Sequence, residues 1–194
     1  MLIGAIFLRS YLYCLRYKLN DLFKEEKRMK MRILTEKDAE EFRKLRLKGL
    51  QTDASAFGST YELECDLPLK EFEQRLVPSE EQFVVGGFEE NQLVCTASFI
   101  RADEEKEQHK GSLAGIYCEK AYRGTGIAKA VIEYTIAHAR TLEGLKMLTL
   151  IVVSENERAK AFYETFGFET YGTEPNAMFD GVKYYDEDSM FLEL

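Results

Sequence analysis

Two glycines and an arginine stand directly before a helical pattern of apolar residues at 121–139, which reads AYRGTGIAKAVIEYTIAHA. The first turn of a helix leaves backbone N–H groups without intrahelical partners, and the helix dipole favours an anion there. Gly124 and Gly126 carry no side chain that blocks a phosphate, and Arg123 adds positive charge. The stretch therefore predicts an anion-binding turn, although glycines before a helix also form turns that bind nothing.

Two common nucleotide-binding motifs do not fit this turn. A dinucleotide-binding motif places G-x-G-x-x-G after the first strand of a domain, whereas this glycine pair follows the fourth predicted strand and position 129 is Lys. A P-loop requires Gly-Lys-Ser or Gly-Lys-Thr, and neither follows here. Both interpretations are therefore disfavoured.

The elements that position the turn alternate between strand and helix. Residues 30–35 predict a first strand, and Thr35 with Asp38 predicts a capped helix that follows it. The later segments, taken in order, predict a helix at 67–76 entered through Pro68, a hairpin of 82–90 and 92–102, a strand at 112–119, a helix from 126 to about 142, a central strand at 146–153 that is apolar on both faces, a short helix ending at Gly167, and terminal strands around a turn at 180–181. One α/β domain is predicted.

Residues 123–128 match the pattern Q/R-x-x-G-x-G/A, and residues 152–169 match N-x-x-A-x-x-x-Y followed by a Gly-Phe strand. With both motifs in this order, separated by one helix and one strand, the chain resembles the GNAT superfamily of acetyl-CoA-dependent N-acetyltransferases. The resemblance covers residues 31–194. It implies an α/β (α+β) GNAT fold, with a mixed central sheet of six to seven strands and about four helices on both faces.

The resemblance also implies how the co-substrate acetyl-CoA is held. Backbone groups would contact its pantetheine arm at the end of the fourth strand and its pyrophosphate at the glycine turn: Ile116, Tyr117, Cys118, Arg123, Gly124, Thr125, Gly126, Ile127 and Ala128. Asn156 matches an asparagine that hydrogen-bonds the cofactor, and Tyr163 matches the general acid that protonates the CoA thiolate. The same residues also fit a helix N-cap and a core aromatic, and Cys118 fits a buried strand thiol.

The general base is not specified by the resemblance, because the positions where some relatives carry glutamate are Ser112 and Ile151 here. Acidic candidates elsewhere in the chain are Glu119, Glu174, Glu62, Glu64 and Asp186. Each of these carboxylates also fits a solvated surface, and together they would form an acidic entrance that attracts a cationic amine.

The activity implied by the resemblance is direct transfer of an acetyl group to a primary amine, a small amine or a protein N-terminus, in a ternary complex without a metal. Because no base transfers from the family pattern, a catalytically weak acyl-CoA-binding regulatory module is the alternative. Residues 57–64 and 171–190 have a looser similarity to relatives that act on ribosomal proteins or small amines. On that similarity Tyr61, Tyr184 and Tyr185 are expected to line the acceptor site.

The composition narrows the partners. The formal net charge of −8 argues against a general grip on nucleic acid or anionic membrane, since both need a positive surface. The cysteines contain no C-x-x-C pair, which predicts reduced thiols and no zinc site: Cys14, Cys65, Cys95 and Cys118. We expect a cytoplasmic protein, with a homodimer as one option.

Residues 1–30 differ from the rest, with seven Lys or Arg and three Asp or Glu. Their apolar stretch precedes the charges and is too short to cross a bilayer, which argues against a secretory signal and a spanning helix. Three interpretations stay open: translated upstream sequence before a natural start at Met29 or Met31, a basic amphipathic arm, or a membrane-surface anchor. The predicted division is thus a basic extension at 1–30 and a single domain at 31–194.

Overall fold

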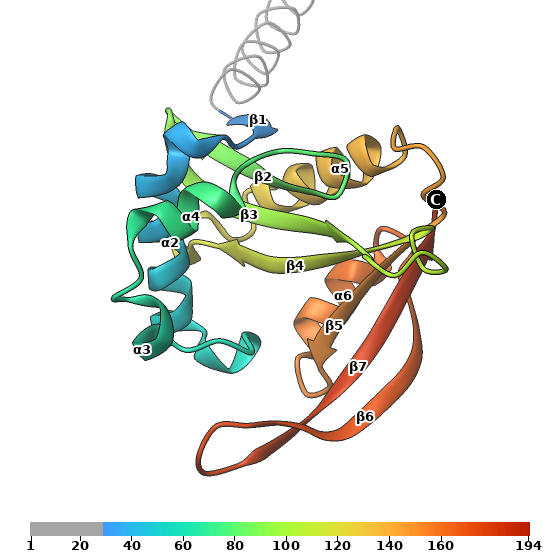
Figure 1. Cartoon of the computed structure of the whole chain (residues 1–194). Coiled ribbons are helices and arrows are strands. Elements are labelled where there is room, and N and C mark those ends of the chain that lie inside the picture. Colours follow the sequence, from blue (N-terminus) through green and yellow to red (C-terminus); the bar gives the residue numbers. More distant parts are fainter. Residues whose placement is uncertain (1–28) are drawn as a thin grey trace, which may run out of the picture.

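The computed structural model describes residues 29–194, so the interpretations of residues 1–28 lie outside the described part. Seven strands form one mixed sheet in the order β1-β2-β3-β4-β5-β7-β6 (Figure 1). Every neighbouring pair is antiparallel except β4 and β5, which are parallel. The strands are β1 (Met29–Ile33), β2 (Gln82–Glu89), β3 (Gln92–Arg101), β4 (Lys110–Cys118), β5 (Met147–Val153), β6 (Glu169–Phe179) and β7 (Tyr184–Glu193).

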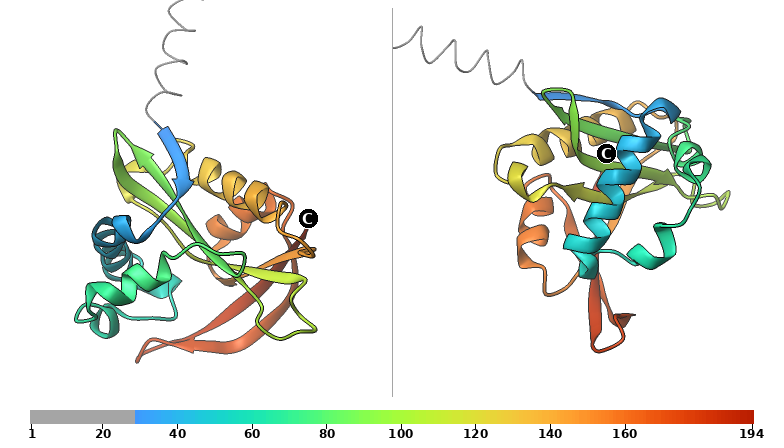
Figure 2. Two further views of the ribbon diagram at one scale, coloured as in Figure 1. Left: turned by 45° about the horizontal axis from the view of Figure 1, so that its top comes forward. Right: turned by 90° about the vertical axis from the view of Figure 1, so that its left-hand side faces the viewer.

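The helices lie on both faces of this sheet. Helices α2 to α4 cover one face, and α5 and α6 cover the other (Figures 1 and 2). The α-helices of the described residues are α2 (Ala39–Thr52), α3 (Tyr61–Glu64), α4 (Leu69–Arg75), α5 (Ile127–Ala139) and α6 (Glu157–Glu164). Single 3-10 turns lie at Glu36–Asp38, Ala54–Ala56 and Lys120–Tyr122. The predicted fold class is confirmed, and the helix that sequence reasoning missed is the single turn α3.

Local signals explain where the helices begin. The Asp38 carboxylate accepts the Thr35 backbone N–H at 2.9 Å, as the capping pattern predicts, and a 3-10 turn then leads into α2. Helix α4 begins after Pro68, which needs no N–H partner at a helix start. Both predicted helix starts are confirmed.

The two faces of the sheet bury separate apolar cores. On one face α5 presents Ile127, Val131 and Ile132, which are fully buried against β2 to β5 and β7. On the other face Phe42 and Leu45 of α2 pack with Phe72 of α4. Each such side chain contributes about 1.5–3 kcal/mol of burial free energy, so each helix layer is anchored independently.

The predicted hairpin between β2 and β3 turns at Glu90 and Asn91. Both residues have positive φ, 49° and 71°, as a two-residue turn of the type that matches strand twist requires. The second hairpin, β6–β7, turns at residues 180–183, where the Asp180 carboxylate accepts the N–H groups of Val182 and Lys183, each at 2.8 Å. This hairpin extends beyond the helices (Figure 1).

Strands β4 and β5 part along most of their length. Their register contains three pairs, the last of them Ser112 with Thr149. Beyond this point β4 pairs with β3 alone and carries a bulge at Gly115, whose φ is +57°. Strand β5 has the interior position that was predicted, but Ile151 is 65% exposed: it pairs with Ser189 of β7, whereas β4 no longer pairs with β5 at this point. The expectation that β5 is buried on both faces is therefore wrong at this residue.

Candidate active site

The glycine turn before α5 is open and rich in unpaired donors. Gly124 and Gly126 have φ values of +84° and +94°, and Gly126 occupies the N-cap position of α5. A Cβ placed on either glycine would meet no atom within 4 Å. The first N–H groups of α5 have no intrahelical partners by helix geometry. The turn therefore offers donors, a favourable dipole and space for an anion.

The Arg123 side chain, which was expected to add positive charge at the turn, contacts two protein groups. Its Nε donates to the Cys118 carbonyl at 2.9 Å, and its Nη2 pairs with Asp53 Oδ2 at 2.8 Å. The hydrogen bond from Arg123 lowers the pKa of Asp53 below its usual value. The guanidinium thus links the turn to the end of α2, and the Arg123 backbone N–H donates to the Lys120 carbonyl at 3.4 Å, so the free backbone donors for an anion are those at the start of α5.

The end of β4 has one edge without a strand neighbour. Tyr117 and Cys118 pair with Thr96 and Cys95 of β3, whereas the edge toward β5 is unpaired beyond Ser112. The backbone from Ile116 to Cys118 therefore borders the gap between β4 and β5. The predicted burial of the Cys118 thiol is confirmed, and it lies opposite the buried Cys95.

Asn156 caps α6, since its Oδ1 accepts the Ala159 N–H at 3.1 Å. Its Nδ2 makes no hydrogen bond within residues 29–194. The residue can therefore cap the helix and also donate to a ligand, as its two interpretations allowed.

Tyr163 lies on the inner side of α6, only 9% exposed, with its ring 6.1 Å from that of Phe168. Burial raises the pKa of Tyr163 to about 12. Its hydroxyl makes no hydrogen bond within the described part of the chain and is not fully enclosed. Tyr163 is therefore a protonated phenol at neutral pH with a hydroxyl available to a ligand.

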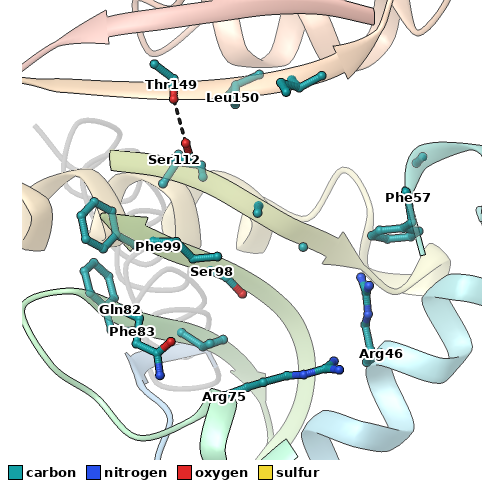
Figure 3. A pocket seen from close by; sticks show the side chains of 18 of the residues that line it. Arg46, Phe57, Arg75, Gln82, Phe83, Ser98, Phe99, Ser112, Thr149 and Leu150 are labelled. Carbon is teal, nitrogen blue, oxygen red and sulfur yellow. Dashed lines mark hydrogen bonds between the residues drawn. The ribbon is translucent and has the colours of Figure 1, made fainter. Parts of the chain in front are cut away.

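A cavity of about 560 Å³ opens where β4 and β5 part, on the side of α2 and α4 (Figure 3). Its lining combines aromatic rings such as Phe57 and Phe99 with the side chains of Arg46 and Arg75. Ser112 and Thr149, the last paired residues of the two strands, share a hydrogen bond of 2.9 Å at its wall. A cavity of this size accommodates a small organic ligand.

Glu187 is the one carboxylate among the described residues that line this cavity. Burial raises the pKa of Glu187, and the charge of Glu174, its cross-strand partner on β6, raises it further. Sequence reasoning missed it and named Asp186 instead. Side chains of a strand alternate between its two faces, and Met190 of β7 is buried on one face. Glu187, three residues earlier, therefore lies on the opposite face, and this alternation could be recognised in the sequence.

The acidic residues named from the sequence lie outside the cavity lining. Glu119 pairs with Lys48 at 2.7 Å, and Asp186 accepts the Asn176 N–H at 2.8 Å. Glu62 and Glu174 are exposed. Glu64 is buried between two arginines, and although burial favours its neutral form, hydrogen bonds from Arg46 and Arg75 lower its pKa to about 2. A carboxylate held at that pKa is a poor base.

The tyrosines expected at the acceptor site do not line the cavity either. Tyr184 stacks on Phe179 at 4.5 Å, and the Tyr185 hydroxyl donates to Asp180 at 2.7 Å, both near the tip of the extended β6–β7 hairpin. Tyr61 begins α3 and is also outside the lining. Among the tyrosines of the described residues, Tyr171 of β6 lines the cavity.

Two further observations concern metals and membranes. Within residues 29–194 no group of three or more His, Cys, Asp or Glu side chains is arranged to hold a metal ion. Over the same residues no helix is long and apolar enough to cross a bilayer. Cellular location and a homodimer stay predictions.

Comparison with known proteins shows the family of the chain. Residues 47–168 match the sequence profile of the acetyltransferase (GNAT) family. The 5-NmdU N-acetyltransferase of Pseudomonas phage PaMx11 is 33% identical over 93 residues, and the match covers 37% of this chain and 64% of that protein. The chain therefore spans a little under two thirds of the length of this relative.

Solved structures share the fold at low sequence identity. A GNAT-family acetyltransferase from Streptococcus pneumoniae superposes with a TM-score of 0.77 and 23% identity, over 86% of this chain and 99% of that one. A putative acetyltransferase from Salmonella typhimurium, solved with its cofactor acetyl-CoA, superposes with a TM-score of 0.74 and 18% identity, over 86% and 94%. These likenesses establish the same chain topology.

Proposed function

The chain belongs to the acetyltransferase (GNAT) family, and from this premise we propose that it transfers an acetyl group from acetyl-CoA to a primary amine by direct attack. The observation that carries the proposal is the parting of β4 and β5 after Ser112 and Thr149. The cavity lies beside this parting on the side of α2 and α4, and the glycine turn precedes α5 on the other face, so we assign the acceptor to the cavity and the donor to the turn.

The residues of the turn fit the pyrophosphate of CoA, because the two glycines leave space and the start of α5 supplies N–H donors. The free edge of β4 at 116–118 would hold the pantetheine arm, and Asn156 Nδ2 would donate to the same ligand. Acetyl-CoA supplies an activated acyl carbon and a thiolate leaving group. No covalent acetyl-cysteine is needed, since Cys118 is buried without a histidine beside it in the sequence.

Tyr163 is the proposed general acid. Its pKa of about 12 keeps the proton on the phenol at neutral pH, and the hydroxyl has no competing partner among the described residues. A thiolate that forms in an apolar environment is stabilised by a proton from such a donor.

Glu187 is the proposed general base. An amine reaches the enzyme as an ammonium ion and attacks only after it loses a proton, directly to a carboxylate or through a water. Glu187 lines the cavity, and its raised pKa brings it closer to that of a base operating at neutral pH. Together with Glu174 it also makes this side of the cavity attractive to an ammonium group.

An acceptor screen with the full chain tests the proposal. Polyamines, aminoglycosides, amino acids and peptides are incubated with acetyl-CoA, and N-acetylated product is measured by mass spectrometry beside the release of free CoA. We expect saturable transfer to a subset of amines. Calorimetric binding of CoA without transfer to any member would instead support an acyl-CoA-binding regulatory module.

The substitution Glu187→Gln tests the base within the same assay. We expect kcat to fall about 100-fold, in the range typical of a lost general base, with little change in the KM of acetyl-CoA. Glu193→Gln, on the same strand and outside the cavity lining, is the matched control. Unchanged turnover in Glu187→Gln would remove Glu187 from the mechanism.

A further inference from the structure

Two arginines from separate helices face the cavity and share one buried carboxylate. Arg46 of α2 donates from Nε and Nη2 to Glu64, at 2.8 Å for the shortest contact, and Arg75 of α4 donates from Nη1 to the same group at 2.8 Å. Glu64 is only 4% exposed and stays ionised. Two positive charges against one negative charge leave this cluster with a net charge of +1.

The cluster keeps donors that no protein group uses. Nη1 of Arg46 and both Nε and Nη2 of Arg75 have no partner within residues 29–194, and none of them is fully enclosed. Each guanidinium is also held in orientation by an aromatic ring, Arg46 at 4.9 Å from Phe57 and Arg75 at 4.9 Å from Phe72. Oriented guanidinium groups lose little freedom when they bind a planar anion.

The charges on the cavity wall are separated. Arg46 and Arg75 come from the helices that cover β2 to β4, whereas Glu187 is on β7, which follows β5 in the sheet. Figure 3 shows the Arg46 side chain extending toward Phe57 and the Arg75 side chain extending toward Arg46. A ligand that places a positive group near Glu187 and a negative group near the arginines would complement both charges.

We propose that Arg46 and Arg75 bind a carboxylate of the acceptor, so that the substrate class is amino acids, compounds that carry a primary amine together with a carboxylate. The inference rests on the proposed function, because it takes the cavity as the acceptor site. Arginine pairs with carboxylates through parallel N–H bonds, which selects this group by geometry as well as charge. Phe57 and Phe99 are apolar parts of the cavity lining and suit an apolar amino-acid side chain. Acceptors that are purely cationic, such as polyamines, leave the arginines unmatched.

A binding experiment that needs no turnover tests this inference. The probes are N-acetyl-glycine, N-acetyl-leucine and N-acetyl-phenylalanine, each compared with its carboxamide, which has nearly the same shape but no charge. Calorimetry with the full chain and CoA measures the dissociation constants. We expect at least one acid to bind about tenfold or more tightly than its amide, as a charge-assisted contact implies. Equal affinity for acid and amide in all three pairs would overturn the inference.

The variant Arg75→Gln tests whether the preference for acid over amide depends on the cluster of Arg46, Arg75 and Glu64. It is chosen over a change at Arg46 because the Arg75 side chain is 39% exposed and the Arg46–Glu64 contact remains. We expect the preference for acid over amide to disappear, and Arg75→Lys to restore part of it. Arg32→Gln, which removes a guanidinium paired with Asp38 away from the cavity, should keep the full preference. A full preference in Arg75→Gln would assign the anion to another site and contradict the proposal.

The two hypotheses fail in different ways. If acids are preferred but no amine is acetylated, the anion site stands and the proposed transferase activity does not. If amines without a carboxylate are acetylated as well as amino acids are, the transferase stands and the inference fails.

Discussion

The two faces of the sheet differ in how their parts of the site are assembled. On the face of α5 and α6, the free edge of β4, the glycine turn and Tyr163 come from one continuous stretch at 112–169. On the face of α2 and α4, the cavity gathers Arg46, Arg75 and Glu187 from three elements far apart in the chain. A site built from consecutive elements can be described by short motifs, whereas one built from distant elements depends on strand register and helix packing.

The largest expected effect is on the face of α5 and α6. Tyr163→Phe keeps the ring but removes the only proton of the phenol that can be donated, so we expect kcat to fall about 100-fold or more. The KM of acetyl-CoA should change little, since no hydrogen bond of the described residues is lost. Steady-state kinetics checks this, with the exposed Tyr134→Phe on α5 as control. Normal turnover in Tyr163→Phe would leave this face with a role in binding alone.

On the face of α2 and α4, we expect a substitution of Glu64 to reduce the stability of the fold. The pKa of Glu64 falls from 4.5 to about 2 on folding, which at 1.36 kcal/mol per unit corresponds to about 3 kcal/mol. Because this folded-state pKa is depressed, the contribution is complete above pH 4.5 and is lost as the pH falls toward 2. We expect Glu64→Gln to lower the free energy of unfolding at pH 7 by about that amount and to flatten the acid part of the curve.

Urea unfolding at pH 7 and at pH 3 measures the effect, with Glu62→Gln, an exposed neighbour in α3, as control. Equal stability of the two variants at pH 7 would show that the arginines are held by other contacts.

A smaller effect is expected at the turn. Gly126→Asp places a carboxylate where the proposed pyrophosphate binds, at a residue with φ of +94°, so we expect the KM of acetyl-CoA to rise about tenfold. Gly181→Asp, at φ +96° in the distant β6–β7 turn, introduces the same backbone strain without the charge at the site. If both variants raise this KM equally, the effect is structural and the turn is not the anion site.

The smallest effect links the acidic pair on β6 and β7. If the deprotonated Glu187 carries the reaction, kcat/KM is lost as the pH falls through its pKa. The charge of Glu174 adds to the burial that raises this pKa, so Glu174→Gln should move the acid limb of the profile to lower pH. Glu169→Gln, also on β6, is the control. If the acid limb of the kcat/KM profile does not shift in Glu174→Gln, another residue is the general base.

Features that depend on neighbouring residues in the chain could be predicted from the sequence, whereas contacts between distant segments could not. The turn at Gly124–Gly126, the N-cap at Asn156 and the hairpin at Glu90–Asn91 depend on neighbours in the chain, and all three were predicted. The use of Arg123 as a link to Asp53, 70 residues away, depends on tertiary packing and was not. Glu187 is an intermediate case. The alternation of β7 could be predicted from the sequence, but the cavity that Glu187 lines could not.

The parting of β4 and β5 has one more consequence. Strands β1 to β4 and strands β5 to β7 form two parts of the sheet, which are joined by the three pairs between 110–112 and 147–149 and by the apolar core beneath α5. In the proposed position, the amide-bearing arm of CoA would lie between these two parts of the sheet. A ligand that binds only the folded chain stabilises it by mass action. We therefore expect bound CoA to raise the thermal stability of the folded chain.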